Sequence, residues 1–416
     1  MNVRTTLVGG AALLLSAALA GPAGAAAGPT RPGSDHSATR KAVEAAVEAG
    51  VPGATATTKD ARGSWSTTAG VGDLRMGTPR SAADRYRVAS ITKTFVSTVL
   101  LQLEAEGRLS LDDTVDRWLP GVVRGHGHDG RRITLRQLLN HTSGIYNYTS
   151  DDDFVRAYFL KDGFFRHRYD TLTPRDLVAI ALRHEPAFAP GTSWEYSNTN
   201  YVVAGMVIEK VTGRPYATEI RHRIIGPLHL TATSVPGIRV TVPRPSSRAY
   251  SKLAPTAEGP TYDVTTLNPS LAYSAGEMIS DSADLDRFYS ALLRGRLLPA
   301  KQLTEMKTTV RAVGIPHTGY GLGLMDTQLS CGVHVWGHSG GIQGSISFAV
   351  TTADGRRSLA FNFNGDWAGG MAAVLEAEFC GETGATPGSA SSSVPKGLRY
   401  RTAHRARELL GGGKGN

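Results

Sequence analysis

The spacing of apolar residues along the chain predicts a series of helices. After Ser90, apolar residues recur every three or four positions until Gly107 interrupts them, which is typical of a long helix with a buried face. Capping signals at Thr134 and Thr173 open two further stretches of this kind. The predicted helices cover residues 38–49, 90–106, 135–140, 174–184, 199–211, 282–294 and 367–380.

Strand signals are confined to the beginning and the last third of the chain, where Asp354-Gly355 is a strong hairpin signal. This order predicts an α/β fold, in which an antiparallel sheet is flanked by the terminal helices and carries an inserted, mostly helical region. The sheet part takes about 38–89 and 300–383, and the helical part about 90–299. The predicted strands are 54–58, 64–70, 333–337, 342–351 and 356–364.

Residues 1–27 have the pattern of an export signal. A positive start at Arg4 precedes a short apolar stretch at 5–20, and small residues follow as cleavage sites. An uncleaved membrane anchor is the alternative, but Gly residues interrupt the apolar stretch. Because no later stretch of about 18 apolar residues occurs, we expect a secreted protein with no integral membrane segment after signal removal. Its folded domain would cover 28–383.

Composition is that of a globular chain with a basic extension. Hydrophobic residues make up 41% and charged residues 19%, which is enough to bury a core. More than half of the formal net charge of +9 lies in 384–416, a low-complexity basic tail that we expect to be disordered or removed. Nucleic-acid-binding proteins carry their basic surface on the folded domain, so we exclude nucleic acid as a partner.

Cys331 and Cys380 are the two cysteines of the chain. In an oxidising compartment they predict one disulfide, whose loop would contribute roughly 4 kcal/mol of stability. Two free buried thiols are the alternative. The chain has no His-Glu-x-x-His motif, and its cysteines are far apart, so neither a metal nor another cofactor is expected.

Ser90 and Lys93 form a Ser-x-x-Lys pair at the start of the predicted long helix. Residues three apart share one helical face, so the amine can reach the hydroxyl. A lysine whose pKa is lowered by burial can then act as the base that activates the serine. The motif alone is unspecific, because Ser393 and Lys396 in the tail match it as well.

Two further groups of residues carry candidate chemistry. Tyr196 and Asn198 precede the helix 199–211, where a tyrosine can relay a proton and an asparagine can orient a substrate amide. A buried tyrosine and a helix-capping asparagine are the structural alternatives. His338, Ser339 and Gly340 follow a β-rich run, and this context favours them over the similar patterns His128-Asp129-Gly130 and His317-Thr318-Gly319.

The same segment also matches the nucleophile elbow of α/β-hydrolases, because it reads Gly337-His338-Ser339-Gly340-Gly341. An elbow requires a strand before the serine and a helix after it, and then an acid and a histidine. Here a strand is predicted to follow, and the one later histidine, His404, lies in the tail. An esterase that uses Ser339 is therefore the weaker hypothesis.

Taken together, the three groups resemble the motifs of the penicillin-recognising serine hydrolases, over roughly residues 38–382. The tyrosine in the second motif and the histidine in the third resemble the secreted actinomycete DD-carboxypeptidase/transpeptidase branch, which is close to the class C β-lactamases. Other matching stretches are Tyr86-Arg87-Val88-Ala89-Ser90, His141-x-Ser143-Gly144, Tyr196-Ser197-Asn198-Thr199-Asn200, Ser274-Ala275-Gly276 and Tyr320-Gly321-Leu322-Gly323-Leu324.

The resemblance implies a β-lactamase/DD-peptidase-like fold and an acyl-enzyme mechanism. Ser90 would be the nucleophile and Lys93 its base. Tyr196 and His338 would complete a proton-transfer network with Lys93. Asn198, His338, Ser339, Gly340 and Gly341 would bind substrate, and the backbone N–H groups of Ser90 and Gly341 would form the oxyanion hole. β-Lactams would acylate Ser90.

Two positions depart from the DD-carboxypeptidase pattern. Those enzymes place an Arg after the Gly-Leu-Gly-Leu stretch and a Thr after His-x-Gly, and both contact the substrate's terminal carboxylate. Here the residues are Met325 and Gly341, and a charge-assisted bond to a carboxylate contributes roughly 1.5–3 kcal/mol. These two departures can therefore change substrate specificity without changing the acyl-enzyme mechanism.

We expect a monomeric hydrolase of the D-Ala-D-Ala carboxypeptidase/transpeptidase type, acting on peptides, including peptidoglycan stem peptides, or on β-lactams. The alternatives are a D-stereospecific aminopeptidase or amidase, an endo-acting D-peptidase, an esterase and a β-lactamase on the same fold. A non-catalytic β-lactam-binding protein is a further alternative.

Overall fold

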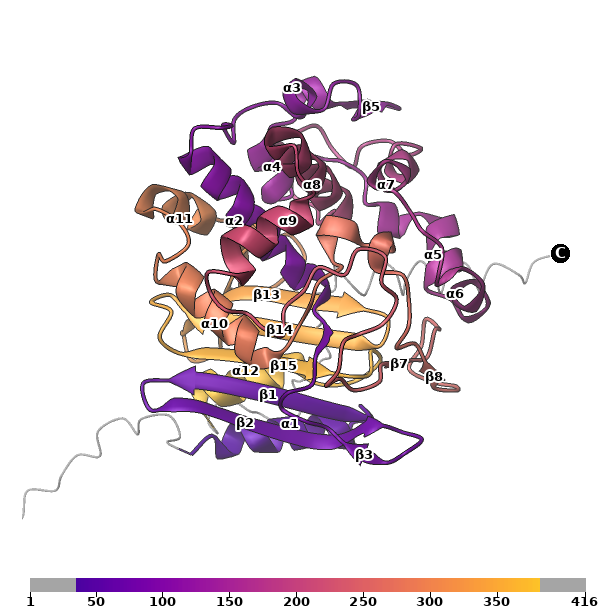
Figure 1. Ribbon diagram of the computed structural model, residues 1–416, viewed down its shortest axis with the longest axis vertical. Helices are drawn as coiled ribbons and strands as arrows, with labels where there is room; N and C mark the ends of the chain where they lie inside the picture. The colour runs from indigo at the N-terminus through magenta and orange to yellow at the C-terminus, as the bar shows by residue number, and fades with distance from the viewer. Residues whose placement is uncertain (1–34, 382–416) are drawn as a thin grey trace, which may run out of the picture.

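A nine-stranded antiparallel sheet forms the centre of the structure, a computed structural model that describes residues 35–381 (Figure 1). The predicted export signal and basic tail lie outside the described residues. The strands follow the order β10 (Val310–Arg311), β11 (Thr318–Tyr320), β12 (Met325–Gln328), β13 (His334–Ile342), β14 (Ser345–Thr352), β15 (Ser358–Phe363), β1 (Gly53–Asp60), β2 (Gly63–Asp73) and β3 (Thr78–Pro79).

The two ends of the chain meet in the middle of this sheet. Strand β1 pairs with β15 from Ala54 opposite Phe363 to Lys59 opposite Ser358. Three short two-stranded ribbons lie outside the main sheet: β4 (Tyr86–Arg87) with β9 (Ile279–Ser280), β5 (Arg124–Gly125) with β6 (His128–Asp129), and β7 (Tyr250–Ser251) with β8 (Tyr262–Asp263). The predicted α/β arrangement, with a sheet made from both chain ends, is confirmed.

Most of the helices lie in the part of the chain between β4 and β10, above the sheet in Figure 1. The helices are α1 (Ser37–Glu48), α2 (Thr92–Ala105), α3 (Val115–Trp118), α4 (Leu135–Leu139), α5 (Asp152–Tyr158), α6 (Lys161–His167), α7 (Pro174–Ala181), α8 (Asn198–Thr212), α9 (Tyr216–Ile220), α10 (Ser282–Leu293), α11 (Ala300–Lys307) and α12 (Met371–Cys380). Short 3₁₀ or π turns are Ala89–Ile91, Gly130–Arg132, Tyr148–Ser150, Arg221–Ile225, Pro269–Leu271 and Tyr273–Ala275.

The sheet separates two hydrophobic cores, because successive side chains of a strand point to opposite faces. On β14, Phe348 and Val350 pack in one core with the terminal helices α1 and α12, which contact each other. Ala349 between them belongs to the other core, which α10 and the helical region form. The small side chains Ala349 and Ala360 face each other across β14 and β15, and α10 packs on these two strands.

The structure corrects three details of the predicted elements. Residues 338–341 form no break between two strands, since β13 runs without interruption from His334 to Ile342. The last helix begins at Met371 rather than at 367, after Gly369 with φ +100°. The strands β10 to β12 were not predicted, because runs of two to four residues are too short to show a period of two.

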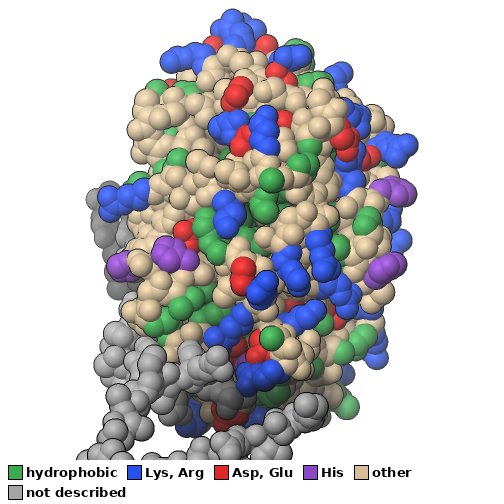
Figure 2. All heavy atoms as spheres, turned by 90° about the vertical axis from the view of Figure 1, so that its left-hand side faces the viewer, with side chains coloured by type: hydrophobic (Ala, Val, Ile, Leu, Met, Phe, Trp, Pro, Cys, Tyr) green, Lys and Arg blue, Asp and Glu red, His purple; other side chains and the backbone are tan. Residues whose placement is uncertain are grey.

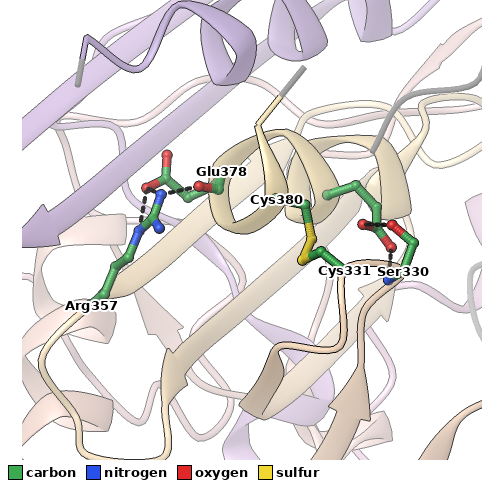
Figure 3. Close-up of a disulfide and its surroundings, with 6 residues drawn as sticks. Ser330, Cys331, Arg357, Glu378 and Cys380 are labelled. Carbon is green, nitrogen blue, oxygen red and sulfur yellow. Dashed lines mark hydrogen bonds and ion pairs between the residues drawn. A yellow bond between two sulfur atoms is a disulfide. The ribbon is translucent and has the colours of Figure 1, made fainter. Parts of the chain in front are cut away.

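The predicted disulfide joins Cys331, between β12 and β13, to Cys380 at the end of α12 (Figure 3). Nearby, the backbone N–H and the hydroxyl of Ser330 both donate hydrogen bonds to the Glu376 carboxylate. Arg357 forms an ion pair with Glu378 at 3.0 Å. These contacts attach the last helix to the connections β12–β13 and β14–β15 of the sheet.

Replacing both cysteines by serine is expected to lower the free energy of unfolding by about 4 kcal/mol, because the disulfide closes a loop of 49 residues in the unfolded chain. Chemical denaturation of the variant and of the wild type would measure this difference. Reduced wild type is the control and should match the variant. An unchanged denaturation midpoint would contradict the prediction.

None of the helices within residues 35–381 combines the length and the apolar character needed to cross a membrane.

Candidate active site

Ser90 lies where the chain passes from the strand β4 into the helix α2. It belongs to the 3₁₀ turn Ala89–Ile91, and the side chains of this turn are buried. The preceding residue, Ala89, has φ +48°, a left-handed conformation that non-glycine residues rarely adopt. Such strain is retained only where the surrounding structure enforces it, and it often occurs at functional sites.

Strands β13 and β14 hold the segment before Ser90 in place. The Ser345 hydroxyl donates a hydrogen bond to the carbonyl of Arg87 at 2.8 Å, and the Ser347 hydroxyl donates to that of Val88 at 3.2 Å. On β13, a Cβ atom at Gly340 would lie 2.0 Å from the Val88 carbonyl oxygen. Gly340 is therefore needed for the close approach of two backbones.

Lys93, in the first turn of α2, is fully buried, and its amine has three oxygen neighbours. Its Nζ lies 3.1 Å from Ser90 Oγ, 2.7 Å from Asn198 Oδ1 and 2.7 Å from the Ala275 carbonyl oxygen. It forms no ion pair with any described residue. Burial lowers the pKa of Lys93 well below its ordinary value.

This geometry fits an uncharged amine. A neutral amine has two N–H donors and one lone pair. The amide oxygen of Asn198 and the carbonyl of Ala275 accept hydrogen bonds and cannot donate them, so they take the two N–H groups. The lone pair is left for the Ser90 hydroxyl. Lys93 is therefore placed as a base toward Ser90.

The Tyr196 ring lies beside the amine of Lys93, 4.9 Å from Nζ to the ring centroid. Burial raises the pKa of its phenol well above the ordinary value, and the nearby Ser90 hydroxyl offsets this only in part. The phenol oxygen has no partner of hydrogen-bonding geometry among the described residues. Tyr196 is thus a protonated phenol that faces the nucleophile and is free to bond a substrate or leaving group.

His141 holds the loop that carries Tyr196 in place. Its Nδ1 accepts hydrogen bonds from the backbone N–H of Ser197 at 3.2 Å and from the side-chain amide of Asn200 at 3.1 Å. Its ring lies 4.3 Å from the Tyr196 ring, between centroids. Burial lowers the pKa of His141 well below the ordinary value. A neutral His141 therefore fixes this loop.

Asn198 lies next to Lys93, and its role in binding substrate stays a prediction. Its Oδ1 accepts from Lys93, its Nδ2 donates to Thr149 Oγ1 at 3.1 Å, and its backbone N–H donates to Asn147 Oδ1 at 3.0 Å. It begins the helix α8, whose capping position is Ser197. Both polar groups of its side chain are bonded within the protein, so in this structure Asn198 orients Lys93.

His338 is buried in β13, and both of its ring nitrogens are engaged. Nδ1–H donates to the Ser339 carbonyl at 2.6 Å, and Nε2 lies 2.9 Å from the hydroxyl of Tyr320, which donates. Burial lowers the pKa of His338 to about 3. Neither nitrogen is bonded to Lys93 or Tyr196, so the structure does not connect His338 to the expected proton-transfer network.

Ser339 and Gly341 lie on either side of Gly340 in the same strand. Ser339 is in the middle of β13 and is followed by the antiparallel strand β14, so the strand–serine–helix context of an α/β-hydrolase elbow is absent at this serine. Strand β13 pairs with β12 only as far as Gly337, but with β14 as far as Ile342. Residues 338–342 therefore have one edge without a neighbouring strand, where an extended substrate can lie. Gly341 is exposed there.

Met325, one of the two departures from the carboxypeptidase pattern, contributes to an apolar wall beside Tyr196. This side chain on β12 is buried in a cluster that also contains Trp194, Tyr320 and Ala312. An apolar wall offers no charge to a substrate carboxylate. Its aromatic surface instead suits an apolar side chain.

Three functional contacts were not predicted from the sequence. The Ala275 carbonyl that binds Lys93 is a backbone group, and the sequence signal for it was the small-residue stretch Ser274-Ala275-Gly276. Tyr320 bonds His338, and His141 supports Tyr196. Tyr320 and His141 both lie in stretches that match the family, but the spacing of residues in the sequence does not indicate which residues they contact.

A metal site is not formed by the one cluster of candidate ligands among residues 35–381. This cluster consists of Cys331, Glu376 and Cys380, and its two sulfur atoms are joined in the disulfide. Metal binding requires free thiolates.

Replacing Tyr320 by Phe is expected to lower the free energy of unfolding by about 1–3 kcal/mol, because Nε2 of the buried His338 loses its donor. Urea denaturation would measure the change. The matched control is Tyr289→Phe, which removes a buried hydroxyl from Thr94 while Thr94 keeps its bond to the Gly323 carbonyl. An equal loss of stability in the two variants would show that His338 does not depend on Tyr320.

Comparison with known proteins agrees with this geometry. The family model described as Beta-lactamase matches residues 39–375. A solved D-stereospecific amidohydrolase from Streptomyces sp. is 63% identical, with a TM-score of 0.80, over 83% of this chain and 99% of that one. D-amino acid amidase from Ochrobactrum anthropi SV3, solved with D-phenylalanine, is 28% identical, with a TM-score of 0.71, over 82% of this chain and 97% of that one.

A curated relative gives the same family from sequence. Penicillin-binding protein 4* of Bacillus subtilis (strain 168) is 28% identical over 315 residues, which are 71% of this chain and 64% of that protein. The match thus spans less than two thirds of this relative. From the family model, the sheet and the placement of the Ser90–Lys93 pair, we conclude that the chain belongs to the beta-lactamase family of serine hydrolases.

Proposed function

We propose that the protein is a D-stereospecific amidohydrolase, which cleaves the amide bond on the carbonyl side of a D-amino-acid residue through an acyl-enzyme on Ser90. The observation that carries this proposal is the 63% identity to the Streptomyces D-stereospecific amidohydrolase over 83% of the chain. The D-amino acid amidase at 28% identity supports the same substrate class. This function is the alternative that the sequence left open beside a DD-carboxypeptidase.

The residues at positions 325 and 341 support an amidase over a carboxypeptidase. A carboxypeptidase must neutralise the terminal carboxylate of its substrate, and the two positions expected to do so carry a buried methionine and a glycine. Neither side chain can form a charge-assisted bond. A substrate that ends in an uncharged amide loses nothing by their absence.

The residues present can perform both halves of the reaction. The Ser90 proton passes to the lone pair of Lys93 while Oγ attacks the carbonyl carbon of the substrate. The tetrahedral intermediate then breaks its C–N bond, and the leaving amine takes a proton from the Tyr196 phenol, which recovers one from the protonated Lys93. Water attacks the acyl-enzyme by the reverse proton route and releases the D-residue as a free acid.

A panel of D-Ala-D-Ala peptides with free and with amidated C-termini tests the proposal, with the L-configured amides as stereochemical controls and Ser90→Ala as the inactive control. We expect kcat/KM to be higher for amidated than for free D-peptides, and the L-amides to be poor substrates. A clear preference for free carboxyl termini would favour the carboxypeptidase instead. Equal rates for D- and L-amides would refute stereospecificity.

Gly341→Thr should shift this preference toward free carboxyl termini. A Cβ at Gly341 meets only Ile346 Cδ1, at 3.4 Å, so the position accepts a side chain. A threonine hydroxyl can donate a hydrogen bond to a carboxylate, and bonds to charged groups contribute roughly 1.5–3 kcal/mol. The ratio of kcat/KM for free over amidated peptides should rise about tenfold, whereas Gly341→Ala should leave it unchanged. An equal effect of the two variants would contradict the argument.

A further inference from the structure

Two adjoining hollows lie at the end of the sheet that is remote from Gly341. They are formed where β1 ends and where β14 turns into β15, beside the last turn of α10, and measure about 350 and 340 Å³. Both are lined by Lys59, Ser290 and Arg294, the first also by Arg356 and Ser358, and the second also by Arg287 and Arg296.

The walls of these basic hollows carry positive charge that the protein does not neutralise. Lys59, Arg294 and Arg296 form no ion pair with a described residue. Among the neighbouring carboxylates, Asp60 is bonded to Arg62 through both Nε and Nη2, at 3.0 and 2.8 Å. Asp284 pairs with Arg287 at 3.3 Å, and Asp354 pairs with Arg356 at 3.8 Å. Figure 2 faces this end of the molecule, and Lys and Arg side chains gather across its centre and lower half.

The turn between β14 and β15, which carries Arg356, packs against α10, which carries Ser290. Ser290 Oγ donates a hydrogen bond to the Gly355 carbonyl at 2.7 Å. Gly355 has φ +68°, and a Cβ there would lie 2.7 Å from Arg294 Cγ. The turn that carries Arg356 is therefore fixed next to Arg294, so little ordering is needed when a ligand binds.

The wall of the first hollow contains a buried hydroxyl and a buried carboxyl group. The Ser358 hydroxyl interacts with the carboxyl group of Asp286 and has no hydrogen bond of standard geometry with a described residue. Both carboxyl oxygens of Asp286, which lies behind it, also lack a hydrogen bond of that geometry with a described residue. Burial raises the pKa of Asp286 well above its ordinary value, which favours its uncharged form. An uncharged Asp286 can donate to Ser358 Oγ, which leaves the hydroxyl proton of Ser358 for a ligand in the hollow.

We propose that the basic hollows bind a linear polyphosphate, a chain of repeated phosphate groups without nucleobases. One arginine guanidinium group can bind two oxygens of a phosphate at once. Four of the five cationic residues that line the hollows are arginines. Two hollows that share a wall can hold neighbouring phosphates of one chain. The Ser358 hydroxyl would donate to the phosphate in the first hollow.

This site is separate from the catalytic one. Along β14, the turn lies six positions from Ile346, which pairs with Gly341, and this is about 20 Å at the rise of an extended strand. A bound polymer would therefore anchor the enzyme and leave Ser90 accessible. The proposal does not depend on the identity of the amide substrate.

The test is fluorescence anisotropy of an end-labelled polyphosphate chain with the full-length protein. We expect binding that weakens about tenfold or more between ~50 and ~200 mM salt, and unlabelled inorganic phosphate should compete far more weakly than unlabelled polyphosphate. Arg294→Glu with Arg356→Glu should weaken binding at least tenfold. Catalytic activity and the melting temperature of this variant should remain as in the wild type.

The matched control is Arg166→Glu with Arg175→Glu, which makes the same change in net charge at exposed arginines of α6 and α7. The basic tail is present in every variant, so its contribution cancels. We expect less than a twofold loss for the control. Equal losses of affinity in the two double variants would refute binding at the basic hollows, since affinity would then depend only on the net charge of the protein. Equal binding of a polyglutamate of similar length would refute the preference for phosphate over carboxylate. Equally strong competition by inorganic phosphate would refute the preference for a polymer over a single phosphate.

Discussion

Replacing Lys93 by Met lowers kcat/KM by about 10³-fold in the mechanism that the site supports, because a general base contributes roughly 10²–10⁴-fold. Methionine keeps the length of the side chain inside the buried site and removes only the amine. Labelled penicillin and intact-mass analysis would report the acylation step directly: an adduct on the wild type, little on Lys93→Met, and none on Ser90→Ala. The control is Lys210→Met, an exposed residue of α8.

The same substitution should change how the stability of the protein depends on pH. Burial lowers the folded-state pKa of Lys93 below its unfolded value of about 10.4. Between those two values the unfolded chain binds more protons, so the contribution of Lys93 to stability rises with pH. The free energy of unfolding of the wild type, relative to Lys93→Met, should therefore increase between about pH 7 and about pH 10. Retention of more than a tenth of the activity by Lys93→Met, or a relative stability that falls with pH, would refute the assignment.

Gly340→Ala is expected to destabilise the protein by about 3 kcal/mol, the upper end of ordinary overpacking, and to abolish acylation. The added Cβ would lie 2.0 Å from the Val88 carbonyl oxygen and 2.9 Å from Ser347 Oγ. Strand β13 must then move away from the segment that carries Ser90.

Gly341→Ala is the matched control for this effect, because it adds the same methyl group one residue further along β13. Its Cβ meets only the end of the Ile346 side chain, at 3.4 Å. Urea denaturation and the rate of penicillin labelling should be close to wild type for Gly341→Ala and strongly reduced for Gly340→Ala. Similar behaviour of the two variants would show that the contact with Val88 is not what requires a glycine.

The sequence predicted the parts of the fold and site that depend on local spacing. A serine and a lysine three positions apart must share a helical face, and the hairpin at Asp354-Gly355 follows from local turn chemistry. These features are present in the structure. The glycine-rich run 338–341 predicts a break between two strands, whereas in the structure the absence of a side chain at Gly340 lets β13 approach the backbone at Val88.

The remaining parts of the site depend on contacts between distant segments. The Ala275 carbonyl is a backbone acceptor and has no residue-type signature. The pairing of Tyr320 with His338, and the hydrogen bond from Lys93 to Asn198, follow from how β11, β13 and α8 converge. Periodicity within one segment carries no information about such convergence.

The meeting of β1 and β15 in one sheet has a consequence for biosynthesis. The ribosome makes Ser90 and Lys93 early, but the strands that position them, β13 and β14, are among the last segments to emerge. A nascent chain that lacks these strands has no hydroxyl to hold the carbonyls of Arg87 and Val88, and no β13 edge against which a substrate can lie. The candidate active site is therefore incomplete until nearly all of the polypeptide has been synthesised.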